Sequence, residues 1–329
     1  MKIFIDLSTA NQRFDRLLRK WCKPYPNVKL SDIFSWIRKG TVRVNDKKTK
    51  EEYRLQIGDE VEIPDELLGK KDPETLITKK ARILQKTNKA DLQHLIIFED
   101  DNRVVFNKPA GIVAHESTNH RNELSMNDYL EIYAKEHIKG TFKPSFGYRL
   151  DKDTSGVLIG AKKYEALQYL NQIIRGREID KTYVTLVVGN PPKHLLIEKA
   201  IEKSYHTQFN RAKMIINENS GMPSKTEVET LKTIFHHGLG QISLLKVKLH
   251  TGRMHQIRIH LASEGFPVLG DLLYGNPAVN RKLHTLFHLQ RQLLHCRNYR
   301  FIDFTGQVID LTAPVPAEFA KVFGSGSFL

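Results

Sequence analysis

Residues 149–161, with the sequence RLDKDTSGVLIGA, join a dense polar segment to an uninterrupted apolar run. The first eight positions hold two Asp, one Arg, one Lys, one Thr and one Ser. These residue types favour turns, because their side chains hydrogen-bond nearby backbone groups. The short apolar run that follows predicts a buried β-strand. By itself the stretch indicates a polar turn before a strand, so any chemical role for its carboxylates depends on the segments around it.

Similar patterns recur on both sides of this stretch and predict a mixed α+β domain. Residues 95–98 and 104–106 are apolar and flank a turn, which is typical of a hairpin. Residues 163–176 place apolar side chains at helical spacing. Further strand-like segments lie at 156–163, 181–189, 241–249 and 254–262. We therefore expect a large antiparallel or mixed sheet with helices beside it.

The N-terminal segment predicts a smaller unit of two helices followed by strands. Apolar residues recur at i, i+3, i+4 and i+7 in two places, at Phe14, Leu17, Leu18 and Trp21 and again at Leu30, Ile33, Phe34 and Ile37. Ser31 and Asp32 are candidates for the N-cap of the second helix, and Gly40 is the expected C-cap. Alternation at 42–44 and again within 53–64 then predicts strands.

These patterns divide the chain into four parts. We expect a small domain at 1–63, a charged linker at 64–93 with a short helix at 79–86, a large domain at 94–320 and a flexible tail at 321–329. The linker prediction follows from its charge, its prolines and its lack of a sustained apolar period.

Composition narrows the class of partner. Lys and Arg number 51 against 37 Asp and Glu, a formal net charge of +14, while hydrophobic residues make up an ordinary 40%. A folded, basic protein most simply binds a polyanion. Cys22 and Cys296 have no Cys or His neighbours at metal-ligand spacing, which argues against a disulfide framework or a zinc ribbon. With no signal-like or membrane-length apolar run, we expect a cytoplasmic protein and no membrane partner.

The small N-terminal domain concentrates positive charge, which by itself indicates only a solvated basic face. However, its segments RFDRLLRK, IRKGTVRVN and GDEVEIP resemble the S4 (alpha-L) RNA-binding domain. The resemblance implies docking on structured RNA through contacts of Lys and Arg with the backbone. It assigns RNA binding to Arg13, Arg16, Arg38, Lys39 and Arg43.

Three separated motifs of the large domain occur in a fixed order: GYRLDKDTSG at 147–156, REIDKTYVTLVVG at 177–189 and LHTGRMHQIRIH at 249–260. Together they resemble the pseudouridine synthases that act on large-subunit ribosomal RNA and on tRNA. The segments EDDNRVVFNKPAGIVAH and VLGDLLYG support the match, which extends from about residue 95 to 316. The resemblance implies an isomerase whose catalytic domain is built on a mixed, mainly antiparallel β-sheet with flanking helices.

The chemistry of this family explains the residues that the motifs contain. Conversion of uridine to pseudouridine breaks an N-glycosidic bond, rotates the uracil and joins its C5 to the sugar. Nothing is oxidised or hydrolysed, so we expect no cofactor and no metal, but an anionic group is needed beside the sugar. The resemblance assigns that role to Asp151, makes Arg258 its partner, and puts Tyr183 against the uracil. Without the motifs, Arg258 would be a surface strand residue and Tyr183 a packed sheet residue.

The resemblance also implies base flipping, because the reacting atoms are inaccessible in a stacked strand. Arg149 is the expected wedge that fills the gap left by the flipped nucleotide, and Arg253 and His255 are expected to bind RNA. The family usually has His before this Arg, and here Tyr148 suggests an altered fit to the RNA strand. We expect Thr154, Ser155 and Gly156 to shape the loop, with the hydroxyls bonded to its backbone, and Asp153 to face solvent or to cap the loop.

Other interpretations remain open at this point. His250, His255 and His260 invite a metal site, but their spacing of five does not converge on one ion. The leading hypothesis is a synthase that modifies uridines of 23S ribosomal RNA, free or in assembly particles, and acts as a monomer. Alternatives are a tRNA-directed synthase and a catalytically silent ribosome-assembly protein that binds RNA. An S4-bearing methyltransferase is a further alternative, but the chain shows no Gly-rich loop after a strand to hold its cofactor.

Overall fold

The computed structural model describes residues 2–6, 9–22, 25, 27–68, 83–84, 86–116, 124–138, 142–206 and 211–324. The chain forms two compact units, one of residues 1–88 with 134–143 and one of residues 89–133 with 144–329. Residues 69–82 and 85 of the predicted linker lie outside the described residues, which includes most of its expected short helix; 83, 84 and 86 are helical, and 65–67 form a 3-10 turn, η1. Among the described residues, no helix is both long and apolar enough to cross a membrane.

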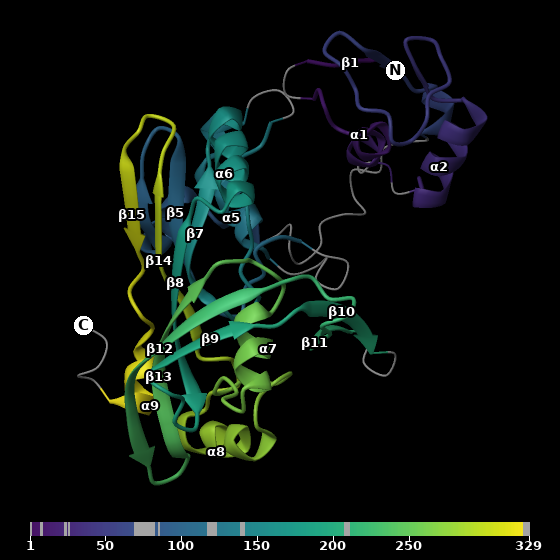
Figure 1. The fold of residues 1–329 in the computed structure, drawn as a ribbon. Helices are drawn as coiled ribbons and strands as arrows, with labels where there is room; N and C mark the ends of the chain where they lie inside the picture. The colour runs from purple at the N-terminus through teal and green to yellow at the C-terminus, as the bar shows by residue number, and fades with distance from the viewer. Residues whose placement is uncertain are drawn as a thin grey trace. The chain divides into compact units, whose positions relative to one another are not determined.

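The N-terminal unit contains the two predicted helices beside a small sheet. Its elements are β1 (Lys2–Phe4), α1 (Phe14–Trp21), α2 (Leu30–Lys39), β2 (Arg43–Val44), β3 (Glu60–Glu62), η1 (Asp65–Leu67) and η4 (Lys135–His137). The strands pair antiparallel in the order β1-β3-β2 (Figure 1). Phe14, Leu17 and Leu18 are buried in its core, as their helical spacing predicts.

The caps of α2 are partly as expected. Gly40 closes the helix with a φ of 72°, a conformation that favours glycine. The predicted N-cap was wrong by two or three positions, because the helix begins at Leu30 and Lys29 is its N-cap. Asp32 instead occupies the third position of the first turn, where its carboxylate accepts the Lys29 backbone N–H at 2.8 Å.

The C-terminal unit is built on a ten-stranded sheet with helices beside both ends (Figure 1). Its first elements are α4 (Lys89–Leu92), η2 (Gln93–Leu95), β4 (Ile96–Glu99), β5 (Arg103–Lys108), α5 (Met126–Tyr133), β6 (Ser145–Phe146), β7 (Ser155–Ala161), α6 (Tyr164–Gly176), β8 (Asp180–Val188) and β9 (His194–Glu198). Then follow β10 (Ile201–His206), β11 (Arg211–Ile216), β12 (Lys225–His236), β13 (Gly240–Leu249), α7 (Gln256–Ser263), α8 (Pro277–Phe287), β14 (Leu294–Ile302), β15 (Val308–Thr312) and α9 (Ala317–Phe323).

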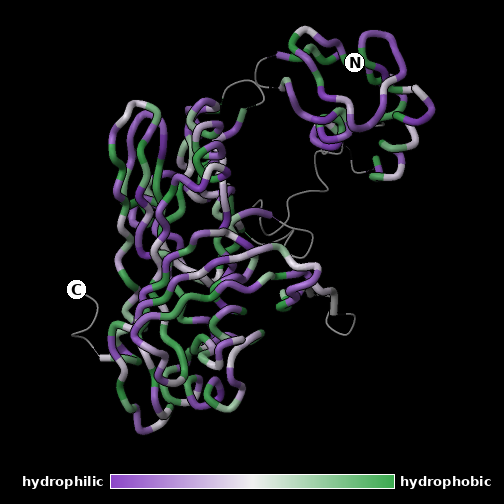
Figure 2. The backbone as a smooth tube through the Cα atoms, in the orientation of Figure 1, coloured by the Kyte–Doolittle hydropathy of each residue, from purple (hydrophilic) through white to green (hydrophobic). Residues whose placement is uncertain are grey.

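The sheet order is β4-β5-β7-β14-β8-β13-β12-β9, with β15 beside β14 and β6 beside β7, while β10 and β11 form a separate hairpin. Among the described strands of this sheet, only β7 and β14 pair in parallel, and the other pairs are antiparallel. The predicted α+β class with a mainly antiparallel sheet is therefore confirmed. β7 is buried at every position, as its apolar run predicts. In the first half of β12 the buried residues Thr226, Val228 and Thr230 alternate with more exposed ones, and Figure 2 shows hydrophobic and hydrophilic residues interspersed along the strands of this unit.

The parallel pair positions the polar turn of residues 149–154 beside the middle of the sheet. Gly156 lies opposite Cys296 and has a φ of 116°. A Cβ at this glycine would lie 2.1 Å from the Cys296 carbonyl oxygen, so only glycine permits the close approach of the two strands. The expected structural role of Gly156 agrees with this contact.

Two predictions for this unit were wrong. Residues 254–262 do not form a strand: α7 starts at Gln256, because Ile257 and Leu261 bury one helical face while Arg258 and His260 find buried polar partners. The alternation of apolar and polar residues resembled a strand only in sequence. The expected tail also begins later than residue 321, because α9 continues to Phe323 and buries Val322 and Phe323 in the core. Residues 325–329 lie outside the described part.

Candidate active site

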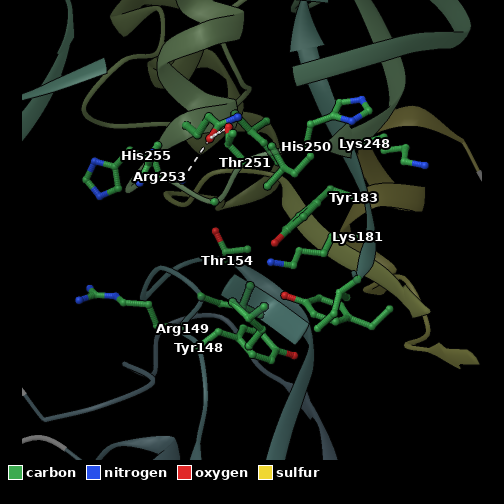
Figure 3. A pocket seen from close by; sticks show the side chains of 18 of the residues that line it. Tyr148, Arg149, Thr154, Lys181, Tyr183, Lys248, His250, Thr251, Arg253 and His255 are labelled. Atoms are coloured by element: carbon green, nitrogen blue, oxygen red, sulfur yellow. Dashed lines mark hydrogen bonds between the residues drawn. The ribbon is translucent and has the colours of Figure 1, made fainter. Parts of the chain in front are cut away.

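A pocket of about 950 Å³ opens in the C-terminal unit where the 148–154 turn, the start of β8, the end of α6 and residues 248–258 meet (Figure 3). Six of the site residues predicted from sequence line it: Asp151, Tyr183, Arg258, Arg149, Arg253 and His255. The other five, Arg13, Arg16, Arg38, Lys39 and Arg43, belong to the N-terminal unit. The structure thus brings the three separated motifs of the large domain to one cavity.

Asp151 and Arg258 are directly paired, although 107 positions separate them in the chain. Arg258 Nη1 donates to Asp151 Oδ2 at 3.0 Å from the first turns of α7. The Asp151 side chain is 19% exposed and that of Arg258 is 8% exposed, so the carboxylate faces the cavity while the cation lies behind it. Such a charge-assisted hydrogen bond fixes the orientation of the carboxylate.

Asp271 holds the other side of the Arg258 guanidinium. Arg258 Nε donates to Asp271 Oδ2 at 2.6 Å and Nη2 donates to Oδ1 at 2.9 Å, which is the bidentate geometry of a buried ion pair. Burial opposes the charge on Arg258, but the hydrogen bonds and attraction from Asp271 and Asp151 raise the pKa of Arg258 above its ordinary value. The guanidinium is therefore a fixed cation with one N–H edge left for Asp151.

Backbone groups hold Asp271 in turn. Its Oδ1 accepts the N–H groups of Leu273 at 2.8 Å and Tyr274 at 3.0 Å. Burial alone would raise the pKa of Asp271, but these bonds and the bonds from Arg258 outweigh it and leave the pKa below its ordinary value. Asp271 is thus an ionised counter-charge at the base of the site.

His255 approaches Asp151 from the N-terminus of α7. Its Nε2 lies 3.8 Å from Asp151 Oδ2, and its Nδ1 lies 3.0 Å from the Tyr274 hydroxyl. His255 adopts a φ of 55°, which is uncommon for a residue other than glycine and directs the ring to this place. Burial lowers the pKa of His255 more than the Asp151 charge raises it, which favours the neutral ring.

The turn that carries Asp151 is supported from below by a buried lysine. Lys108 Nζ donates to three backbone oxygens, those of Pro109 at 2.8 Å, Lys152 at 2.9 Å and Thr154 at 2.8 Å. Burial lowers the pKa of Lys108 to about 7, while the three acceptors match the three N–H bonds of its ammonium form. This network fixes the backbone of the turn on both sides of Asp153.

The turn's hydroxyl groups are held differently from expectation. Thr154 Oγ1 accepts from Gln292 Nε2 at 3.3 Å, and Ser155 Oγ lies 2.9 Å from His295 Nδ1. Both hydroxyls therefore bond side chains next to or on β14, and not the backbone around Asp151, because their residues are buried against that strand. Their expected role in structure still agrees with their burial.

Aromatic residues form the apolar wall of the pocket. Tyr183 is 7% exposed, and burial raises its pKa well above the ordinary value, so its phenol is neutral. Tyr148 stacks on Tyr299 with ring centroids 4.8 Å apart. The Tyr148 hydroxyl donates to the Val157 carbonyl at 3.1 Å and accepts the Ile159 N–H at 3.0 Å. Tyr148 thus lines the cavity with both its ring and its hydroxyl held by other parts of the protein.

Positive charge surrounds the opening. Arg149, Arg175 and Arg177 are exposed there, and Lys225, Lys248 and Arg253 are partly exposed. Arg253 Nε is buried and has no hydrogen-bond partner in the described part of the chain. A buried N–H without an acceptor is costly, and in this pocket it is available to a polar group of a ligand.

The candidate histidine cluster does not converge. His250 contacts Glu227, His255 contacts Tyr274, and His260 lies 2.9 Å from Thr226 Oγ1. No group of three or more His, Cys, Asp or Glu within the described residues could hold a metal ion. Cys22 and Cys296 are both buried and free.

Sequence reasoning did not assign a role to three residues of this site. Asp271 and Tyr274 belong to the segment VLGDLLYG, and Lys108 belongs to VVFNKPAG. Both segments supported the family resemblance, and their match to the family was the only signal that the sequence offered for these residues. Their contacts with Arg258, His255 and the 151–154 turn emerge only from the tertiary structure.

Known proteins resemble this chain in sequence and in fold. The sequence model of the family described as RNA pseudouridylate synthase matches residues 102–263. A ribosomal large subunit pseudouridine synthase C from Vibrio vulnificus is 35% identical over 98% of this chain and 95% of its own length. The protein of that name from Escherichia coli is 33% identical over 95% and 92%. The solved structure of human RNA pseudouridylate synthase domain containing 1 is similar, with a TM-score of 0.56, 25% identity and coverage of 71% and 89%.

The sequence similarity to the Vibrio vulnificus and Escherichia coli proteins extends over nearly the whole length of this chain and of each relative. The chain therefore belongs to the RNA pseudouridylate synthase family. It is an isomerase that converts uridine in RNA to pseudouridine.

Proposed function

We propose that this enzyme isomerises specific uridines of large-subunit (23S) ribosomal RNA. The relatives named ribosomal large subunit pseudouridine synthase C match both units of the chain, and their similarity is not confined to the catalytic unit. The net charge of +14 and the basic rim of the pocket suit a polyanionic substrate. The substrate is thus assigned from likeness and charge together.

The observation that carries the mechanism is the Asp151 carboxylate, which lines the cavity and accepts a hydrogen bond from Arg258. In this account a uridine is flipped into the pocket and Asp151 assists departure of the uracil from C1′. The uracil then rotates, its C5 bonds to C1′, the C5 proton leaves and N1 gains a proton. Asp271 keeps Arg258 in place, so the carboxylate meets the sugar in one orientation.

Tyr183 is the residue that we assign to the uracil ring. Its ring lines the cavity, and its neutral phenol can stack on the base and stay within reach of C5. Arg149, exposed at the opening and two residues before Asp151, is assigned to the space that the flipped nucleotide leaves. Arg253 and His255 are assigned to the RNA on the opposite side of the opening.

The N-terminal unit is proposed to be an S4-like RNA-binding domain that contacts the RNA outside the target nucleotide. Two predicted contacts, Arg16 and Lys39, are exposed on α1 and α2, and backbone-directed charges of this kind add affinity without reading sequence. The predicted domain limits, 1–63 and 94–320 with a linker between them, are part of this proposal.

The proposed site needs no second copy of the chain, because Asp151, Arg258, Asp271 and Tyr183 all come from one chain. We propose a monomer. Its substrate is ribosomal RNA or assembling large-subunit particles, and this substrate is the reason to propose a cytoplasmic location. No cofactor enters the proposed chemistry, since the reaction is an isomerisation without net redox change.

The substrate is tested with uridine labelled with tritium at C5, because pseudouridine formation releases that label. Large-subunit ribosomal RNA, small-subunit ribosomal RNA and tRNA are incubated separately with the enzyme. We expect release from large-subunit RNA, or from its assembly particles, and little from the other two. Release from tRNA alone would replace the ribosomal substrate with a tRNA substrate. Absence of release from all of them would leave RNA binding as the remaining function.

A further inference from the structure

Lys181 is a cation inside the pocket that has no role in the mechanism proposed so far. It lies two residues before Tyr183 on β8, so both side chains project from the same face of the strand. Both line the cavity, and Figure 3 shows them directed from β8 toward its open centre. A Cβ added at Gly252 would lie 3.8 Å from Lys181 Nζ, so the amine reaches across to the loop that precedes α7.

The Lys181 ammonium has no acidic partner. Within the described residues, no hydrogen bond or ion pair joins its Nζ to another group, whereas the neighbouring Lys248 pairs with Asp180 at 2.7 Å. Its nearest aromatic contact is Tyr299, whose ring centroid lies 5.8 Å from Nζ. Burial lowers the pKa of Lys181 below its ordinary value, and the neighbouring Cys296 offsets only part of this effect. An anion that enters the pocket would therefore stabilise the Lys181 ammonium.

We propose that Lys181 is a further catalytic residue, whose ammonium contacts a carbonyl oxygen of the flipped uracil and stabilises the negative charge that the base carries while it is detached from the sugar. The inference rests on the proposed function, and it adds a residue to that same site. It differs from the roles of Asp151 and Arg258, which act at the sugar.

The chemistry explains why a cation is needed at this place. When the N1–C1′ bond breaks, its electron pair stays with the uracil and spreads over N1 and the two carbonyl oxygens. When C5 bonds to C1′, a ring electron pair forms the new bond, the C5 proton leaves and N1 takes up a proton. The ring is thus anionic between the two bonds, and a fixed cation that is short of solvent stabilises that charge strongly.

The position of Lys181 favours the uracil over a phosphate as its contact. The residue shares the face of β8 with Tyr183, the side chain assigned to the base, and it lies inward of the exposed Arg149, Arg175 and Arg177. Phosphates of a flipped nucleotide remain on the strand at the opening, where those three guanidinium groups lie. The base is the part of the nucleotide that enters the pocket.

The test compares Lys181→Met, Lys181→Gln and Lys181→Arg with the wild-type enzyme in single-turnover reactions on C5-labelled large-subunit RNA. Lys246→Met is the matched control, because it removes an exposed lysine on β13 that does not line the pocket. RNA affinity and thermal melting are measured for every variant. Rates are measured across alkaline pH, since an Arg at this position stays protonated where a Lys with a lowered pKa does not.

We expect both neutral variants to lose roughly 100-fold in the saturated rate while RNA affinity changes by less than about threefold. Lys181→Arg should restore much of the rate and remove the fall in rate at alkaline pH that the wild type shows. Lys246→Met should match the wild type. A purely structural lysine would not give this separation of rate from affinity, nor a change in the pH profile.

Several outcomes would overturn the inference. An active wild type with neutral variants of nearly equal rate would remove Lys181 from the chemistry and leave the proposed function intact. Weaker RNA binding with an unchanged saturated rate would make Lys181 a phosphate contact instead. A wild type that releases no label from any RNA would remove the proposed function itself, and this inference with it.

Discussion

Asp271 accepts two hydrogen bonds from the guanidinium of Arg258, one from Nε at 2.6 Å and one from Nη2 at 2.9 Å. This geometry leaves Nη1 as the edge that meets Asp151 at 3.0 Å. The orientation of the Asp151 carboxylate, which we propose to be catalytic, therefore depends on a second carboxylate that does not line the pocket. We therefore propose that Asp271 is a positioning residue, which would act on the reaction only through Arg258.

Asp271→Asn should damage both stability and catalysis. The change removes the charge that compensates for buried Arg258, which typically costs about 3–5 kcal/mol of unfolding free energy. Because Arg258 is then free to reorient, we also expect the saturated rate to fall by roughly 100-fold. Urea unfolding and tritium release measure the two effects, and wild-type values for both would refute the positioning role.

The same variant carries a pH signature. The pKa of Asp271 is lower in the folded protein than in the unfolded chain, so its stabilising contribution is present above about pH 4 and is lost as pH falls through the folded pKa. The difference in unfolding free energy between the wild type and Asp271→Asn should therefore narrow in acid. Urea titrations at neutral pH and below pH 4 measure it, and a constant difference would contradict the assignment.

Lys108→Met should loosen the turn that carries Asp151. The variant keeps the apolar stem of the side chain but leaves the carbonyl oxygens of Pro109, Lys152 and Thr154 without their donor. Leaving buried acceptors unsatisfied should lower the unfolding free energy by about 3 kcal/mol. The turnover rate should also fall, while RNA affinity is retained because Lys108 does not line the pocket. A variant with wild-type stability would show that water replaces the ammonium without cost.

Gly156→Ala tests the parallel junction of β7 and β14. The new methyl group would lie 2.1 Å from the Cys296 carbonyl oxygen, so the strands would have to separate, at a cost above about 3 kcal/mol. Gly240→Ala is the matched control, because Gly240 also has a positive φ but nothing lies within 4 Å of its added Cβ. That control should lose only about 1 kcal/mol of unfolding free energy. Equal losses in thermal or urea unfolding would contradict the close-approach explanation.

Arg16→Gln combined with Lys39→Gln tests the proposed RNA contact of the N-terminal unit. Each phosphate contact that is lost should reduce the slope of log affinity against log salt by roughly 0.7 for single-stranded RNA. We expect weaker binding of large-subunit RNA and an unchanged rate at saturation, because neither residue lines the pocket. A binding curve identical to that of the wild type across salt concentrations would argue against the S4-like role.

The sequence was informative where the local pattern and the environment agree. The buried strand after the polar turn follows from its apolar run, and the helix at 163–176 and both N-terminal helices follow from apolar period; the structure contains all of them. The pattern at 254–262 misled because alternation assumes that polar residues face water. In α7 the polar Arg258 is buried instead, since Asp271 and Asp151 satisfy it.

The site itself could be assembled from sequence only in part. The resemblance of three motifs to a known family predicted Asp151, Tyr183 and Arg258 as site residues, and these three residues line one pocket. Nothing local marks Asp271 or Lys108 as supports of that pocket, because each acts through contacts with distant segments. Such long-range hydrogen bonds depend on how α7 and the central strands pack, which a single sequence does not state.

The central claim is that the Asp151 carboxylate performs the isomerisation. The most direct measurement is tritium release from C5-labelled large-subunit RNA by the wild type, Asp151→Asn and Asp153→Asn, with RNA binding measured in parallel. Asp153, in the same turn, does not line the pocket. The account predicts that Asp151→Asn binds RNA and releases no label, while Asp153→Asn stays active. Turnover by a pure Asp151→Asn preparation at a rate near that of the wild type would contradict it.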